Sequence, residues 1–486
     1  MAATYGGVTL GNNASKCPAG RFHGPLHECV GVTDGSYDFI PQLHLVDQAI
    51  LAENQNARRL AAREHGQVAT IALLLPLTSP DPSMRAEIVQ EVQGAYVAQY
   101  RANHRANGLQ PPIRLVLANP GANSTWYIPV GRDLQAVEGA PDNLRAVAGI
   151  SVSTATTKKE VAWLTKHQIP VVGGAITADD IANTPASDPF PGFARAEPTN
   201  DQEAQALARF GKVSPRQAIV VQDSRTDDDY ITTLAKWFDD HSAYQPFTFQ
   251  SSPDESQPGI TANTFANVTV PGICSVQKTK HINWIYFAGR QVQLRLFINA
   301  LAAGCQGSQF TILTGSAASH LTSDPSLNTA AFSKGLTLEY AAIASSKIWN
   351  GTSQGADGRS AAGWPGFAGT IKAHSGTRQS QIGTVSLANG QSIINYDAVL
   401  TAIAGIRALT NAGNPMPALQ QVAHGWGNLS GTRAVPGASG QICLDNAGNP
   451  YDKPVPIVKY GDLASAVPAW PNGHPPQYPC IVPRNG

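Results

Sequence analysis

The chain has few charged residues for its length of 486: Asp, Glu, Lys and Arg make up 14% of it, against about a quarter in typical soluble proteins. The 34 basic and 34 acidic residues balance and no basic run occurs, which argues against nucleic acid or an anionic membrane as a partner. The longest apolar run, residues 71–77, is far shorter than the roughly 20 residues that a membrane span needs. No charged, apolar and small-residue signal opens the chain, a pattern that also fits prior removal of a signal peptide.

Motifs of catalysis and of metal binding are also missing. The 12 His are scattered without an HExxH pair, and no GxSxG elbow, Walker loop or GxGxxG after a predicted strand occurs. Cys305 follows Gly304 and is most simply a helix stop with a disulfide partner, because a nucleophilic Cys needs a nearby His. We therefore predict a binding protein rather than an enzyme, with no cofactor and no metal. An enzyme on a Rossmann-like scaffold is the weakest alternative.

The six Cys are even in number and show no CxxC spacing, which argues against zinc. Fifteen pairings are possible for six Cys. Because short loops close most readily, the spacing favours Cys17–Cys29, Cys274–Cys305 and Cys443–Cys480. Paired Cys, low Lys and Glu, and the 45 Gly and 35 Pro together predict an extracytoplasmic protein, the alternative being six buried free thiols in the cytosol.

Apolar runs alternate with segments of helical spacing in two successive sets. The predicted strands are 68–77, 113–118, 147–152 and 169–173, then 218–221, 281–288 and 310–313. The predicted helices are 43–64, 84–104 and 158–166, then 201–211, 230–241 and 292–303. Residues 193–198 cross between the sets, and Thr199 and Asn200 cap the next helix. This order predicts an α/β fold of two doubly wound, Rossmann-like lobes, and the restart argues against a single large sheet.

Later segments have a looser pattern. Residues 350–392 are rich in Gly and Ser, which predicts a long surface excursion. An amphipathic helix is expected at 396–409, and the Pro-rich tail is expected to be tied down by Cys480.

Two strand ends about twenty residues apart carry small and hydroxyl residues. They are residues 149–156 and 170–177, and each is an apolar run that stops in Ser, Thr, Ala or Gly. In open α/β sheets, ligands lie just beyond the carboxyl ends of the strands. The two segments therefore predict a polar cradle for a small solute.

Several fragments, in this order and spacing, carry a resemblance to a known family. They are Leu74-Leu-Pro-Leu77, Gly149–Thr156, Pro170–Thr177, Phe193–Pro198, Tyr286-Phe-Ala-Gly289, Tyr396-Asp-Ala-Val399, Val435-Pro-Gly-Ala-Ser-Gly440, Gly448-Asn-Pro450 and Lys453. From about residue 68 to 460, the chain resembles type 1 periplasmic binding proteins, the branched-chain amino acid receptors of ABC transporters.

The resemblance implies two Rossmann-like lobes joined by a three-segment hinge, with the ligand held between the lobes. Carried over, lobe I comprises 66–196 and 315–430, and lobe II comprises 197–314 and 431–465. Residues 1–65 are then an N-terminal extension and 466–486 a C-terminal tail. Closure of the lobes around a ligand is the motion expected of such receptors.

The resemblance also assigns ligand-binding positions residue by residue. Those in the first lobe are Ser79, Ser153, Thr154, Ala175 and Thr177, and those in the second are Asp223, Tyr230, Arg290, Gln291 and Thr314. Hydroxyls and free backbone N–H groups at a helix start can bind an anion, but the same hydroxyls can simply cap the following helix. Tyr230 can close on a ligand or can be an ordinary residue at the start of a helix. The acids of the 223–229 loop can bind a cationic group, or they can be solvated side chains that interact favourably with the dipole of the following helix.

Thr314 departs from the family, whose amino-acid-binding members place an acid there for the ammonium group. An α-amino acid is therefore a doubtful ligand unless Asp223 or Asp227 compensates, and the solute is left unnamed. The predicted function is an extracytoplasmic receptor, secreted or anchored as a lipoprotein, that delivers a small polar or amino-acid-like solute to the permease of an ABC transporter. The alternative is the sensing domain of a membrane-bound signalling receptor. Either is expected to be a monomer or weak dimer.

Overall fold

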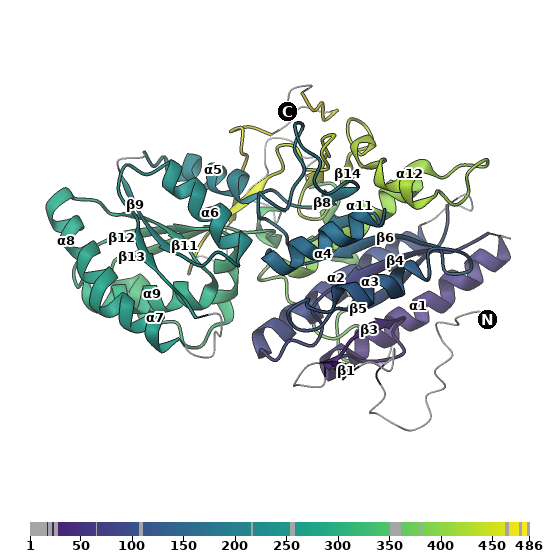
Figure 1. Ribbon diagram of the computed structural model, residues 1–486, viewed down its shortest axis with the longest axis horizontal. Helices are drawn as coiled ribbons and strands as arrows, with labels where there is room; N and C mark the ends of the chain where they lie inside the picture. The colour runs from purple at the N-terminus through teal and green to yellow at the C-terminus, as the bar shows by residue number, and fades with distance from the viewer. Residues whose placement is uncertain are drawn as a thin grey trace.

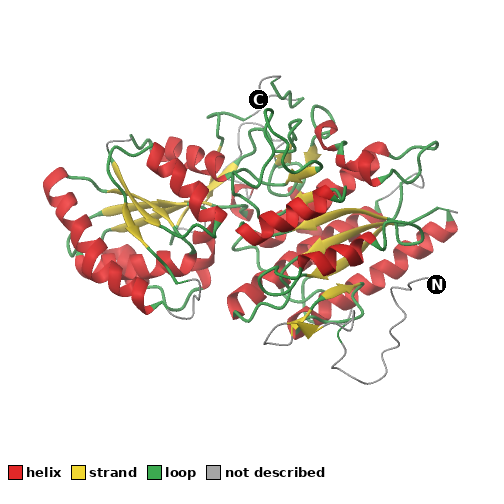
Figure 2. Cartoon of the chain, viewed as in Figure 1, coloured by secondary structure: helices red, strands yellow, loops and turns green. Residues whose placement is uncertain are grey.

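Two lobes, each built on its own sheet, make up the chain (Figure 1). The structure is a computed structural model that describes residues 17, 22–23, 28–64, 66–105, 110–214, 217–252, 258–349, 361–378, 381–461, 466–475 and 479–483. In each lobe, helices cover both faces of the sheet (Figure 2). Two separate sheets confirm the predicted pair of doubly wound lobes and exclude a single undivided sheet.

The first sheet has six strands in the order β3-β5-β4-β6-β7-β8. Their bounds are β3 (Gly31–Thr33), β4 (Ala69–Leu74), β5 (Ile113–Asn119), β6 (Leu144–Gly149), β7 (Val171–Gly173) and β8 (Phe193–Arg195). All neighbours are parallel except β3, which pairs antiparallel with β5. Its helices are α1 (His44–Arg63), α2 (Pro82–His104), α3 (Tyr127–Gln135), α4 (Ala155–Lys166), α10 (Trp364–His374), α11 (Gln391–Leu409) and α12 (Leu419–Ala423), with short helical turns at Pro41–Leu43, Ser346–Trp349 and Trp426–Asn428.

The second sheet has seven strands in the order β10-β9-β11-β12-β13-β16-β17. Their bounds are β9 (Ala218–Asp223), β10 (Phe247–Phe249), β11 (Trp284–Ala288), β12 (Phe310–Thr314), β13 (Leu336–Ala341), β16 (Val455–Lys459) and β17 (Ala466–Ala469). Its helices are α5 (Asn200–Gly211), α6 (Asp229–Asp240), α7 (Gly259–Thr264), α8 (Val270–Lys280) and α9 (Gln291–Gly304), with helical turns at Phe265–Thr269, Ser316–Ser323 (η3) and Thr329–Lys334. Two small hairpins, β1 (Phe22–His23) with β2 (Glu28–Cys29) and β14 (Val435–Pro436) with β15 (Gln441–Ile442), lie outside both sheets.

The lobe boundaries differ from the expected ones in two places. Residues 315–341 belong to lobe II, because η3 packs into its core and β13 pairs with β12. Residues 431–454 pack largely on lobe I, where Val435, Ile442 and Leu444 join its core. In the described residues up to β16, the chain crosses between the lobes three times, between β8 and α5, after β13, and just before β16. The boundaries were missed because η3 and its flanking turns have no helical period, and β13 alternates buried and half-buried residues instead of forming a continuous apolar run.

The described part of the N-terminal extension is integrated into lobe I. Strand β3 forms one edge of the first sheet, and α1 buries Val46, Ile50 and Ala57 against lobe I. The tail differs from expectation in the same way, because β17 completes the second sheet before the chain returns to Cys480. Both ends therefore contribute to the lobes.

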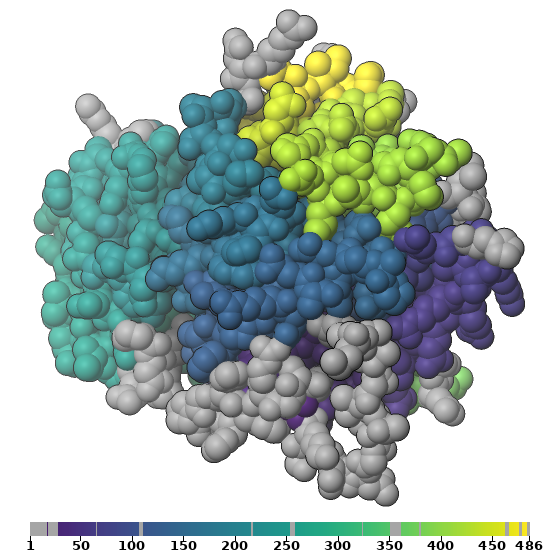
Figure 3. Space-filling view, turned by 45° about the vertical axis from the view of Figure 1, so that its right-hand side comes forward, coloured from purple at the N-terminus to yellow at the C-terminus, as the bar shows by residue number. Residues whose placement is uncertain are grey.

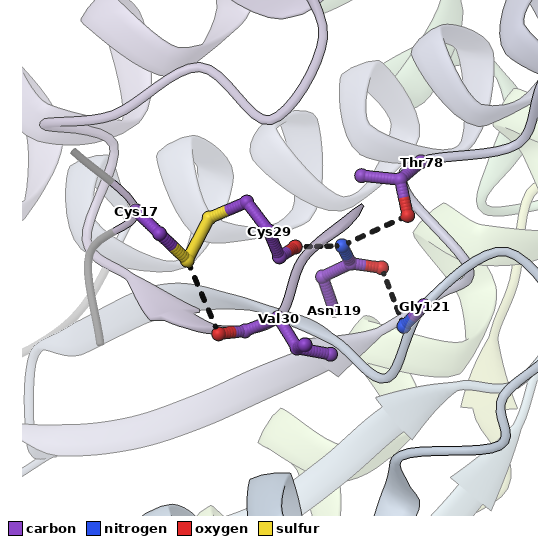
Figure 4. The surroundings of a disulfide bond; sticks show 6 residues. All are labelled: Cys17, Cys29, Val30, Thr78, Asn119 and Gly121. Carbon is purple, nitrogen blue, oxygen red and sulfur yellow. Dashed lines mark hydrogen bonds between the residues drawn. A yellow bond between two sulfur atoms is a disulfide. The ribbon is translucent and has the colours of Figure 1, made fainter. Parts of the chain in front are cut away.

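All three predicted disulfides form: Cys17–Cys29, Cys274–Cys305 and Cys443–Cys480. Figure 4 shows the surroundings of the first, in which Cys17 Sγ lies 3.4 Å from Val30 O. The buried Asn119 side chain, at the end of β5, donates to Cys29 O at 2.7 Å and to Thr78 Oγ1 at 3.2 Å. Its Oδ1 accepts from the N–H groups of Leu77 at 2.9 Å and Gly121 at 3.1 Å. Asn119 thus holds the loop after β4 in place.

Two later helices differ from the sequence prediction. In the predicted surface excursion at 350–392, residues 350–360 lie outside the described part, and α10 buries Trp364 and Phe367 against lobe I. Helix α11 begins at Gln391 and is buried along most of its length rather than amphipathic. By length and composition it is the one helix of the described part that could span a membrane, and it packs inside lobe I between α2 and β6.

Candidate functional site

The two predicted strand-end segments lie side by side. Strand β6 ends in left-handed backbone at Gly149 (φ 100°) and at Ile150 (φ 55°), a conformation that a β-branched residue rarely adopts. Ser153 Oγ then accepts hydrogen bonds from the N–H groups of Thr177 at 3.1 Å and Ala178 at 3.2 Å. The Ser153 side chain therefore joins the end of β6 to the segment that follows β7.

Thr154 caps helix α4. Its hydroxyl accepts from the Thr157 N–H at 3.3 Å, and Thr157 Oγ1 accepts from the Thr154 N–H at 2.8 Å, which completes a capping box. The capping interpretation is therefore confirmed for Thr154. A ligand-binding role for the same residue stays a prediction.

These segments face lobe II directly. Ser153 O accepts from the Tyr230 N–H at 3.2 Å and from Arg290 Nη2 at 3.1 Å, and the Ala155 N–H donates to Asp227 O at 3.2 Å. We call the contact made by these five residues the inter-lobe seam. In the space-filling view, the teal residues of lobe II abut the blue residues of lobe I (Figure 3). Residues 149–156 and 170–177 thus lie where the two lobes meet, as predicted.

A charged group borders the seam on the lobe II side. Asp228 is buried at the start of α6, where its carboxylate accepts from Arg290 at 2.8 and 2.9 Å and from Arg225 at 3.2 Å. Arg225 also pairs with the exposed Asp227 at 3.3 Å. The Arg290 guanidinium lies 4.5 Å from the centre of the Tyr230 ring, within cation–π range. The positive charges of the two guanidinium groups therefore balance the negative charges of the two carboxylates. These contacts fix the position of Arg290 in the seam.

The side chains of three predicted residues, Tyr230, Thr314 and Asp223, are engaged inside lobe II. Buried Tyr230 accepts from the Ala317 N–H at 3.1 Å, and its pKa is raised by burial. The Thr314 hydroxyl donates to Phe287 O at 2.8 Å, within the second sheet. Asp223 accepts from the N–H groups of Ser251 at 3.1 Å and Arg225 at 3.2 Å. Asp223 therefore has hydrogen-bond partners within lobe II, and its compensation for the acid missing at position 314 stays a prediction.

Three further predicted positions lie at the ends of elements. Ser79 is buried in the loop before α2, where its Oγ accepts from the Asp81 N–H at 3.3 Å. Ala175 is half-buried against the core of lobe I, and Gln291 is the half-buried first residue of α9.

Acidic side chains outside the predicted ligand-binding positions also lie near the seam. Glu87 of α2 pairs with His320 of η3, so this contact joins the two lobes. Lys158 of α4 pairs with Asp180 at 2.5 Å. Burial, and then the Asp180 carboxyl, raise the pKa of Asp229 to about 6. A signal was present in the sequence, since Glu87 and Glu91 lie four residues apart and share a face of the predicted helix.

Two other features lie apart from this group. An open depression of about 370 Å³ is lined by Gln222, Asp223, Ser224, Arg225, Thr226, Thr232, Ala235, Lys236, Asp239 and Asp240. It lies beside β9 and α6, within lobe II. In the described part of the chain, no three His, Cys, Asp or Glu side chains are grouped so that they could hold a metal ion.

No protein-family model matches the chain. No curated protein matches it in sequence.

Solved structures share its architecture at low sequence identity. The branched-chain amino acid transporter substrate binding protein LivJ from Streptococcus pneumoniae, in complex with isoleucine, is 13% identical; the match covers 83% of this chain and 100% of that one, with a TM-score of 0.57. An ABC transporter substrate binding protein from Aeropyrum pernix is 13% identical; the match covers 85% of this chain and 98% of that one, with a TM-score of 0.59. An ABC transporter solute binding protein from R. palustris, in complex with 4-hydroxybenzoate, is 13% identical; the match covers 83% of this chain and 95% of that one, with a TM-score of 0.52. The chain therefore has the two-lobed fold of these proteins.

Proposed function

From a fold shared with the substrate-binding proteins of ABC transporters, we propose that this chain captures a small solute between its lobes and delivers it to a transporter permease. The single observation that carries the proposal is the position of Ser153. Its carbonyl oxygen meets both Tyr230 and Arg290 of lobe II, while its hydroxyl joins the two strand ends of lobe I. Polar groups at the carboxyl ends of parallel strands thus lie at the meeting point of two lobes.

The path of the chain supports access to this position. The lobes are joined where the chain crosses between them, and each has its own sheet and cores. A hinge of this kind permits rigid-body opening, which exposes groups that touch in the closed arrangement. Opening separates Ser153 from Arg290 without disturbing either sheet.

The disulfides support an extracytoplasmic location. All six Cys are paired, and such bonds persist in oxidising compartments. A receptor outside the cytoplasm is the arrangement that a solute-binding protein of a transporter requires.

A thermal-shift screen tests the proposal. The panel contains amino acids, aromatic acids, amides, sugars and amines, and at least one compound is expected to raise the melting temperature of the protein, because a ligand that binds only the folded state stabilises it. The Arg290→Met variant is expected to bind that compound at least about tenfold more weakly, since about 1.4 kcal/mol of lost binding energy corresponds to tenfold in Kd.

Arg295→Met is the matched control. The side chains of Arg290 and Arg295 are both 18% exposed, but Arg295 pairs with Asp324 at 3.1 Å within lobe II. Its variant is expected to bind like the wild type. Absence of any stabilising compound would refute the proposal, and equal losses in the two variants would refute the site.

A further inference from the structure

One face of α2 carries two buried carboxyl groups, and the first of them lies where the lobes meet. Glu87 and Glu91 are four residues apart and therefore lie on the same side of the helix. Glu87 pairs with His320, which belongs to lobe II. Separation of the lobes would remove His320 from Glu87 and so uncover the end of the face that leads to Glu91.

Close backbone approaches place Glu91 beside two other polar side chains. Gly94 of α2 lies against Ser392, where a Cβ would come within 2.0 Å of the Ser392 carbonyl oxygen. The side chain of Asn395, one turn further along α11, therefore reaches Glu91 and also lies over Gly174, just after β7. Ser151, just after β6, is the second of these neighbours.

Two neighbours of Glu91, Ser151 and Asn395, have unused acceptor capacity. The Asn395 amide nitrogen donates to Gln391 O at 3.2 Å, whereas its Oδ1 is buried and has no hydrogen-bond partner of good geometry among the described residues. The same holds for Ser151 Oγ. Glu91 is 3% exposed, and burial raises its pKa to about 8, with Ser151 and Asn395 partly opposing this rise.

A cationic partner for Glu91 is missing from the described part of the protein, while the nearby cations have carboxylate partners. Arg225 and Arg290 pair with Asp228, Lys158 pairs with Asp180, and His320 pairs with Glu87. A buried carboxylate without a counter-charge is costly, and a donor-rich cation removes that cost. Two acceptor oxygens without a donor of good geometry, beside a carboxyl group without a counter-charge, are the complement of an ammonium or amidinium group.

We infer that Glu91, Ser151 and Asn395 form a subsite for a cationic group of the solute, an ammonium or amidinium. The inference rests on the proposed function and names the chemical class of its solute. It places the anionic anchor on α2 of lobe I, whereas Thr314 of lobe II is neutral and already bonded to Phe287 O.

The test uses putrescine, agmatine and choline as cationic probes, with 1,4-butanediol and 4-hydroxybenzoate as neutral and anionic ones. At pH 7, at least one of putrescine and agmatine is expected to raise the melting temperature of the wild type, and Glu91→Gln is expected to bind it at least tenfold more weakly. Choline, which has no N–H donor, is expected to bind less well. Binding is also expected to release up to about one proton per molecule from the wild type, measured by calorimetry in two buffers, because the cation favours the ionised carboxyl.

Glu160→Gln is the matched control. Glu160 is also buried in lobe I, its pKa is also raised to about 8 by burial, and it lies beside Ser124 rather than the seam. The Glu160→Gln variant is expected to bind the cationic probe, and to release protons on binding, like the wild type. Equal cation binding by wild type and Glu91→Gln would overturn the subsite. Stabilisation by the diol or 4-hydroxybenzoate, with none by the amines, would overturn the cationic class but leave the proposed function standing. No stabilisation by any of the five probes would overturn the subsite, whereas the proposed function fails only if the broad panel is silent as well.

Discussion

At the scale of single residues, the sequence predicted positions better than roles. Ser153 and Thr154 lie where the strand-end pattern placed them, but the structure shows that Thr154 caps α4 and Ser153 Oγ joins two backbone segments. Asp223 and Thr314 turned out to be engaged inside lobe II. Which partner a polar side chain selects depends on contacts between segments far apart in sequence. Such contacts leave no local pattern.

The burial of Glu91 also depends on contacts between segments far apart in sequence. Its helix was predicted, but burial of its carboxyl depends on α11, which lies about 300 residues further along the chain. Only the packed structure shows that the carboxyl is buried next to Ser151 and Asn395.

The raised pKa of Glu91 predicts how stability depends on pH. The pKa is about 8 in the folded protein against 4.5 in the unfolded chain, so the folded state holds its proton more tightly. The stability that this carboxyl contributes is therefore fully present below about pH 4.5 and is lost as the pH rises through 8. Each pKa unit corresponds to ~1.4 kcal/mol, so Glu91→Gln is expected to reduce the loss between pH 5 and pH 9 by roughly 2 to 5 kcal/mol.

Urea denaturation at the two pH values measures this loss. Glu160→Gln is expected to behave similarly, because burial raises the pKa of Glu160 to about 8 as well. Parallel pH profiles for wild type and Glu91→Gln would show that this carboxyl is solvated.

At the scale of elements, the sequence predicted most strands and helices of the two βα sets, because buried parallel strands and helical periods are local signals. It missed α10, whose buried Trp364 and Phe367 lie in a Gly-rich stretch, and it read α11 as amphipathic. Helix α11 is enclosed by α2 and β6, so apolar residues surround it and the period disappears. The packing of α2 against α11 is therefore the contact that positions the proposed cationic subsite.

Gly94→Ala tests that packing. The added Cβ would come within 2.0 Å of Ser392 O, a backbone atom that cannot rotate away. We expect destabilisation of roughly 1 to 3 kcal/mol, measured by urea denaturation, as for other overpacked cores. Gly369 lies in α10, where an added Cβ would meet open space. Gly369→Ala is therefore expected to stabilise the protein by about 0.5 to 1 kcal/mol. Equal effects in the two variants would show that α2 and α11 do not approach as described.

At the scale of the whole molecule, the two-lobe plan was predicted and the boundaries were not. The plan follows from two sets of alternating elements, whereas the boundaries depend on β13, β16 and β17, which complete the second sheet from two separate parts of the chain. The tail crosses back after β17, and Cys480 bonds to Cys443 beside the lobe I core. Relative motion of the lobes must therefore accommodate this tie as well as the three crossings.

Hydrogen–deuterium exchange with and without a stabilising solute tests the central claim that the solute is held between the lobes. Backbone N–H groups that become buried or hydrogen-bonded on closure exchange more slowly. The account predicts slower exchange in peptides covering residues 149–156, 170–177 and 223–230, on both sides of the seam. Slower exchange confined to the depression around Gln222, Lys236 and Asp240, with the strand-end segments unchanged, would contradict it.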